Sequence, residues 1–173
     1  MTSGRRLAGV GFWAIALVMA PTLARAQEGT GCGGFKWPLD AERAALARPD
    51  KPSLANGGAL AFNVATTLEL QPLASAALPK APERAPKSAQ AYAGHFILGA
   101  PAKAGLYKVT ISSPAWIDVI DGESYLHPKA FTGATACEGA RKSVKFDLPS
   151  RPLAVQFSGV EADRISVIVS PDN

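Results

Sequence analysis

Residues 143–169 read SVKFDLPSRPLAVQFSGVEADRISVIV, and this stretch decides the fold. Apolar side chains occupy every second position in three runs: Val144, Phe146 and Leu148; Leu153, Val155 and Phe157; Ile165, Val167 and Val169. A period of two is typical of β-strands that bury one face. Residues 149–152 and 159–163 separate the runs and contain proline, glycine and aspartate, which favour turns. The stretch therefore predicts three consecutive strands joined by short turns.

The same pattern continues toward the N-terminus. Further strands are expected at residues 60–64, 66–70, 92–98, 107–111, 116–120 and 124–127. Asp121 and Gly122 form a strong hairpin signal between the last two of these. Short strands without intervening helices predict an antiparallel β-sandwich over residues 57–173, with a closed barrel as the alternative.

Residues 71–90 interrupt the strand pattern. They contain prolines at 72, 79, 82 and 86, and a proline cannot donate to a strand ladder. We expect an extended loop on the surface, with polyproline II conformation in places. Such a segment is either a mobile loop or a strip that docks a partner.

Residues 1–26 have the pattern of a secretory signal peptide. Arg5 and Arg6 precede an apolar run over residues 7–20, and Ala24-Arg25-Ala26 supplies a small-x-small cleavage site. The apolar run is short for a membrane span, so we expect cleavage before Gln27 and no membrane anchor afterwards. The chain is therefore expected in the periplasm or outside the cell.

The charge balance changes once this segment is removed. The full chain of 173 residues has a formal net charge of +4, from 18 basic and 14 acidic side chains. Cleavage would leave 15 basic and the same 14 acidic side chains, a net charge of +1. The remaining lysines and arginines are scattered, so no nucleic-acid partner is expected.

Residues 27–56 are expected to form an N-terminal extension with one short helix. Asp40 is the predicted N-cap, residues 41–47 are good helix formers, and Pro49 ends the run. Cys32 in this extension and Cys137 in the sandwich are the only cysteines. In an oxidising compartment an even pair predicts a disulfide, and no C-x-x-C motif suggests redox work.

The hairpin around Asp121 carries the candidate ligand-binding residues. Alternation places Trp116 and Asp118 on one face, opposite Ile117 and Val119, and Tyr125 follows on the second strand. An exposed tryptophan beside a carboxylate can stack on a sugar ring and bind its hydroxyls. The alternative is that Trp116 belongs to the core. Glu138, Arg141 and Lys142 beside Cys137 form a second charged group, read as a docking surface or a solvated strand entrance.

The sequence gives little support for catalysis. No G-x-S-x-G elbow, phosphate-binding loop or dinucleotide fingerprint is present, so no catalytic residue and no cofactor is assigned. We expect a monomeric, non-catalytic binding or accessory protein whose partner is an envelope polymer, a glycan or another protein. A structural or inhibitory module of the cell envelope is an alternative.

Several segments together carry a resemblance to known proteins. They are residues 35–39, 105–109, 115–119, 137–139, 141–144 and 156–159, with Ile165. These segments resemble a family of small exported proteobacterial proteins, some of which are labelled homogentisate 1,2-dioxygenase. The last 70 residues or so also resemble the jelly-roll pre-peptidase C-terminal domains, which are non-catalytic sandwiches.

The dioxygenase label implies a metal site. It would be a small metal-dependent oxygenase with iron held by two histidines and one carboxylate. The chain has two histidines, His95 and His127, and Glu123 or Glu138 would supply the carboxylate. The H-x-H spacing of cupin-type sites is absent. This reading is the enzymatic alternative to the binding protein.

Overall fold

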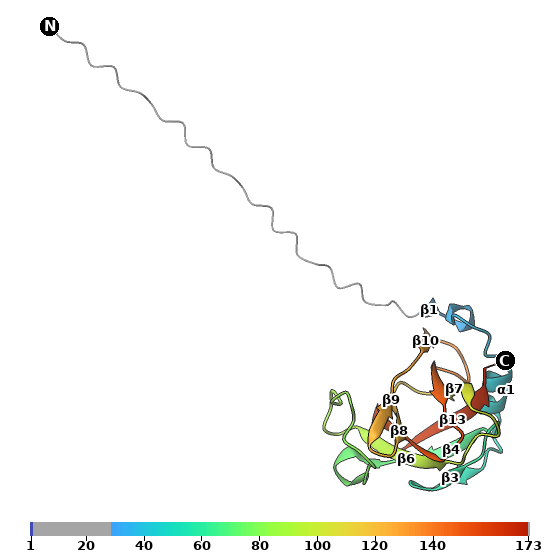
Figure 1. The fold of residues 1–173 in the computed structure, drawn as a ribbon. Helices are drawn as coiled ribbons and strands as arrows, with labels where there is room; N and C mark the ends of the chain where they lie inside the picture. Colours follow the sequence, from blue (N-terminus) through green and yellow to red (C-terminus); the bar gives the residue numbers. More distant parts are fainter. Residues whose placement is uncertain (2–28, 173) are drawn as a thin grey trace.

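The structure is a computed structural model that describes Met1 and residues 29–172. The predicted signal peptide lies almost entirely outside the described residues, so its structure is not considered further. Two β-sheets pack face to face, and one α-helix lies against the larger sheet (Figure 1). Within residues 29–172, no helix is long and apolar enough to cross a membrane.

The larger sheet has seven strands and the smaller one has five strands in a row, with a sixth attached to β6. The larger sheet runs in the order β1 (Gly29–Thr30), β10 (Ala130–Thr135), β11 (Lys142–Leu148), β7 (Gly105–Ile111), β13 (Arg164–Pro171), β4 (Thr66–Glu69) and β2 (Ser53–Leu54). The smaller sheet runs in the order β3 (Ala59–Leu60), β6 (Tyr92–Leu98), β12 (Leu153–Val160), β8 (Trp116–Asp121) and β9 (Ser124–Leu126), with β5 (Gln71–Pro72) paired to β6.

The predicted β-sandwich is confirmed, with one correction. The long central strands are antiparallel, as expected, but β1, β2 and β3 each pair in parallel with a neighbour. These three strands have two residues each and lie at sheet edges. They form because the segment before residue 61 runs along edges that the main strands leave open. The N-terminal extension therefore contributes β1 and β2 to the larger sheet, and β3, which follows the extension, joins the smaller sheet.

The alternating side chains of the central strands fill the space between the sheets. Phe96, Phe146 and Phe157 are the largest fully buried side chains, and Phe96 and Phe157 pack with ring centroids 5.8 Å apart. Each such ring removes on the order of 150–250 Å² from water. This burial provides the main stabilisation of the sandwich.

A short helix covers the outer face of the larger sheet. Helix α1 (Asp40–Ala47) buries Leu46 against Ile168 of β13. It also buries Glu42, whose carboxylate lies 2.7 Å from the Lys108 ammonium of β7 and accepts a 2.7 Å hydrogen bond from Ser170. Asp40 is the first helical residue and makes no cap hydrogen bond, so the predicted N-cap is wrong; Leu39 occupies that position.

A disulfide fixes the chain before this helix. Cys32, in the 3₁₀ turn η1 (Cys32–Gly34), is bonded to Cys137, with the Cα atoms 4.7 Å apart. The bond spans 105 residues of sequence. The predicted pairing is therefore present, and it ties the N-terminal segment to the loop after β10.

Two strand expectations differ from the structure. The predicted strand 60–64 ends at Leu60, because Asn63 adopts a positive φ of 62° that a strand cannot contain. Strand β10 was not predicted, since its sequence AFTGAT lacks regular apolar alternation. It buries the small residues Thr132, Gly133 and Ala134 in succession.

Candidate functional site: a pocket beside Trp116

The outer face of the smaller sheet carries the candidate ligand-binding residues. In the register of β12 and β8, Ser158 pairs with Trp116 and Gln156 pairs with Asp118. Tyr125 of β9 pairs with Ile120, one position further along the same face. Because paired residues point to the same side of a sheet, these side chains share one surface. The predicted placement of Trp116 and Asp118 on a common face is confirmed, and Trp116 is half-buried outside the core cluster.

Asp118 is buried rather than open to a ligand. Only 2% of it is exposed. Its carboxylate accepts hydrogen bonds from Trp116 Nε1 at 2.6 Å, from Gln156 Nε2 at 2.9 Å and from the backbone N–H of Glu83 at 3.4 Å. Three donors occupy the carboxylate, so Asp118 serves to orient Trp116. This role differs from the direct ligand contact expected from the sequence.

The proline-rich segment lies over this network. We call residues 77–91 the covering loop (green in Figure 1); it has no regular secondary structure. Besides Glu83, it docks through the backbone N–H of Lys80, which donates to Gln156 Oε1 at 3.4 Å. The Tyr125 hydroxyl donates to the backbone oxygen of Ala81. The loop expected on the surface is thus attached to its own sheet by polar contacts.

Charged side chains of the covering loop stack on the aromatic rings beneath it. The Lys80 ammonium lies 5.3 Å from the centroid of the Tyr125 ring, and the Arg84 guanidinium lies 5.5 Å from that of Trp116. Partial desolvation raises the pKa of the Tyr125 phenol, and the charges of Asp118 and Glu83 raise it further. Tyr125 therefore remains a neutral hydrogen-bond donor at neutral pH.

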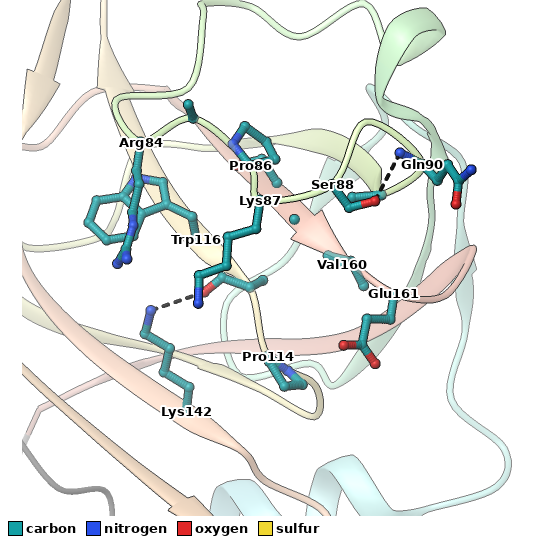
Figure 2. A pocket seen from close by; sticks show the side chains of 15 residues that line it. Arg84, Pro86, Lys87, Ser88, Gln90, Pro114, Trp116, Lys142, Val160 and Glu161 are labelled. Atoms are coloured by element: carbon teal, nitrogen blue, oxygen red, sulfur yellow. Dashed lines mark hydrogen bonds between the residues drawn. The ribbon is translucent and has the colours of Figure 1, made fainter.

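A pocket opens where the covering loop leaves the sheet. Its volume is about 610 Å³, within the range of small-molecule sites. One wall is the covering loop from Arg84 to Ala91, and the other is formed by the ends of β8 and β12 (Figure 2). Trp116 lies at one end of the cavity and Glu161 at the opposite end (Figure 2). The pocket thus exists only because the loop is docked.

Positive charge dominates the pocket lining. Arg84, Lys87 and Lys142 line it, against one acidic side chain, Glu161. The Lys142 ammonium donates to the backbone oxygen of Ala115 at 3.0 Å and lies 5.5 Å from the Trp116 ring centroid. Two cations are therefore held at the indole, from strand β11 and from the covering loop.

One buried hydroxyl lines the same pocket. Ser158 is 1% exposed, and its Oγ has no hydrogen-bond partner among the described residues. It lies beside Trp116 in the sheet register and forms part of the cavity wall. A buried polar atom without a partner is unfavourable and is uncommon in folded proteins. Ser158 thus offers a hydrogen bond to a molecule in the cavity.

The sequence did not single out Ser158, Arg84 or Lys87. Arg84 and Lys87 lie in the segment predicted as a loop, and nothing in their spacing reveals that the loop folds back on Trp116. Lys142 belongs to the charged group beside Cys137, yet its side chain lines the pocket. Strand register is the missing information, because it brings Ser158 beside Trp116 from 42 positions away in sequence.

The residues of the metal alternative lie apart. His95 is on β6 and His127 follows β9, so strands β12 and β8 separate them in the sheet. Glu123 is exposed in the hairpin turn, and Glu138 is exposed beside Cys137 in the other sheet's loop. No group of three histidine, cysteine or acidic side chains within residues 29–172 is placed to hold a metal ion. His95 is half-buried, and this burial lowers its pKa.

Comparison with known proteins adds no relative. The chain matches no family model, no curated protein and no solved structure.

Proposed function

We propose that the protein is an exported, non-catalytic binding module that holds a saccharide in the pocket beside Trp116. The observation that carries the proposal is the fixed indole at the end of a 610 Å³ cavity. The bond from Nε1 to Asp118 directs the polar edge of the indole toward the sheet. With its polar edge satisfied, the indole presents an apolar ring face, on which the C–H face of a sugar would pack beside the Arg84 and Lys142 cations that lie 5.5 Å from the ring centroid.

The rest of the lining supports a polar ligand. Ser158 supplies an unpartnered hydroxyl, and Ser88 and Gln90 of the covering loop add further hydrogen-bonding groups. A saccharide combines an apolar ring face with many hydroxyls, and both kinds of group find partners here. A volume of several hundred Å³ accommodates a ligand of one or two sugar rings.

The make-up of the lining favours binding over hydrolysis. Most glycoside hydrolases use two carboxyl groups flanking the scissile bond. Glu161 is the single carboxylate among the lining residues, and Asp118 is occupied by three donors beneath the ring. The pocket residues therefore suit retention of a glycan rather than its cleavage.

The disulfide and the N-terminal sequence support an exported protein. Disulfides form and persist in oxidising compartments, and the bond between Cys32 and Cys137 fits such a location. The signal-like residues 1–26 point in the same direction. An envelope or extracellular glycan is the ligand that such a protein would meet.

A saccharide panel tests this proposal. Saturation-transfer NMR of the purified protein against neutral and acidic mono- and oligosaccharides should detect at least one ligand. The Trp116→Ala variant should lose the signal, because the indole face is removed. Phe131→Ala is the matched control, since Phe131 is 49% exposed on β10 and does not line the pocket. Binding that persists in Trp116→Ala, or no binding across the panel, would refute the proposal.

A further inference from the structure

We infer that the saccharide is acidic and that Arg84, Lys87 and Lys142 hold its oxyanion beside Trp116. This inference rests on the proposed function and narrows it to one class of sugar, with a uronate as its simplest member. The first argument is the charge of the cavity. Three of its lining side chains are cationic and one is anionic, in a chain whose full formal charge is only +4.

The nearby acids among the described residues lie outside the cavity lining or at the far end of the cavity. Asp118 lies under Trp116, is 2% exposed and accepts hydrogen bonds from Trp116, Gln156 and the backbone N–H of Glu83. Both Glu83 and Asp118 lie near Tyr125, and their charges add to the effect of desolvation in raising the pKa of its phenol. Neither residue lines the cavity. Glu161 lies at the end of the cavity away from Trp116 (Figure 2).

The second argument is the geometry of the cations. A guanidinium stacked over an aromatic ring can still present its N–H edge to a carboxylate in two parallel hydrogen bonds. Arg84 is in this position over Trp116, 5.5 Å from the ring centroid. The side chain of Lys87 extends from the loop toward the amine of Lys142 (Figure 2). The three cationic groups therefore converge on the space in front of the indole.

The third argument is independent of charge. Ser158 Oγ is buried, lines the cavity and has no partner among the described residues. A hydroxyl can both donate and accept, so it suits a sugar hydroxyl adjoining the acid group. A simple inorganic anion held at Arg84 would not need this second contact. A sugar that carries an acid group would bind the cations through that group and Ser158 through a hydroxyl.

A matched pair of ligands tests the inference. Trigalacturonate and its methyl ester have the same sugar rings and differ in whether the carboxylates are charged. Isothermal titration of the purified protein at low salt should show the acid binding about 10-fold or more tightly than the ester, since hydrogen bonds to charged groups are the stronger ones. The preference should shrink as salt is added.

A double variant tests whether the cations of the covering loop contact the acid group. Arg84→Gln combined with Lys87→Gln should weaken binding of the acid about 10-fold or more and weaken binding of the ester much less, so that the preference for the acid shrinks. Both positions are exposed, so the fold should tolerate the change. Arg164→Gln is the control for loss of an exposed cation elsewhere, because the Arg164 side chain is 69% exposed on β13 and does not line the pocket.

The outcomes separate the inference from the proposed function. Equal affinity for acid and ester would overturn the acidic ligand while leaving the saccharide site in place. No binding of either would count against both. Inorganic phosphate alone binding as tightly as trigalacturonate would overturn the sugar component and leave a plain oxyanion site. The remaining outcome is that a sugar phosphate outcompetes trigalacturonate while inorganic phosphate alone binds weakly. That result would support an acidic sugar as the ligand, with a phosphate in place of the carboxylate as its acid group.

Discussion

The two outer faces of the sandwich are covered in different ways. Helix α1 covers the larger sheet with an apolar contact between Leu46 and Ile168 and with the buried pair of Glu42 and Lys108. The covering loop lies on the smaller sheet through hydrogen bonds to Asp118 and other polar side chains. The helix cover combines an apolar contact with a buried ion pair and follows a segment held by a disulfide. The loop cover is held by polar contacts and encloses a pocket.

The difference follows from how each segment satisfies the hydrogen-bonding groups of its own backbone. A helix pairs its N–H and C=O groups internally, so it can press an apolar stripe on a sheet. A proline-rich loop cannot do this, and its N–H groups need acceptors on the surface beneath. Asp118 and Gln156 provide them from buried positions. We therefore assign stability to the helix side and ligand binding to the loop side.

The disulfide should give the largest effect. Replacing Cys32 and Cys137 by serine removes a cross-link that closes a loop of 105 residues. The chain-entropy model gives a loss of about 4–5 kcal/mol in the free energy of unfolding for a loop of this size. Urea denaturation of the two proteins measures the loss. A change well under 1 kcal/mol would show that the helix side does not depend on the cross-link.

The buried ion pair under α1 should come next. Glu42→Gln leaves the Lys108 ammonium, whose side chain is 12% exposed, without its counter-charge. Removing one partner of a buried pair costs about 3 kcal/mol or more. Lys51→Gln, at a position outside this contact, is the control and should change stability little. An unfolding midpoint identical to that of the parent protein would mean that the pair contributes nothing.

The same pair predicts a pH dependence. Burial by itself raises the pKa of Glu42, but the hydrogen bonds from Lys108 and Ser170, a backbone hydrogen bond and the charge of Lys108 outweigh it and lower the pKa below that of an ordinary carboxyl group. The folded state therefore binds this proton less readily than the unfolded state. The stabilisation by the Glu42 carboxylate is complete above the pKa of an ordinary carboxyl group. It disappears as the pH falls through the lowered pKa of Glu42 in the folded state. Acid unfolding curves should be steeper for the parent protein than for Glu42→Gln below about pH 4.5.

On the loop side, Asp118→Asn should loosen the cover without unfolding the sandwich. An amide nitrogen in place of Oδ2 would face the N–H of Glu83 and the amide of Gln156, so donors would oppose donors. We expect a cost of about 2 kcal/mol. The covering loop should then be cut faster by trypsin after Lys80, Arg84 and Lys87. Unchanged cleavage rates, with Asp147→Asn as control on the exposed side of β11, would contradict the docking role of Asp118.

The smallest effect is expected at Tyr125. Tyr125→Phe removes the hydrogen bond to the backbone oxygen of Ala81 but keeps the ring under Lys80. A single neutral hydrogen bond contributes about 1 kcal/mol. Hydrogen exchange of the loop amides should rise modestly while that of the strand amides stays constant. Faster hydrogen exchange throughout both sheets would show that the covering loop does not open independently of the sandwich.

The regular part of the fold could be predicted from the sequence, because period-two alternation reports burial between two sheets. Strands β6 and β11 follow that pattern over part of their length, whereas most residues of β8 and β12 are buried on both faces. Strand β10 escaped prediction because its buried residues are small, and the turn at Asn63 escaped because its positive φ depends on packing. The hairpin with Trp116 could be named as a candidate site. The docked loop, the burial of Asp118 and the role of Ser158 depend on long-range register, which no local pattern encodes.

The most direct test of the account uses the indole N–H signals in two-dimensional NMR. Trp116 lines the pocket, whereas Trp37 lies on the helix side with Lys145 at 4.4 Å from its ring centroid, and so serves as an internal control. Titration with trigalacturonate should shift the Trp116 N–H signal in proportion to occupancy and leave the Trp37 signal in place. Equal shifts of both signals, or a shift of Trp37 alone, would contradict a ligand site beneath the covering loop.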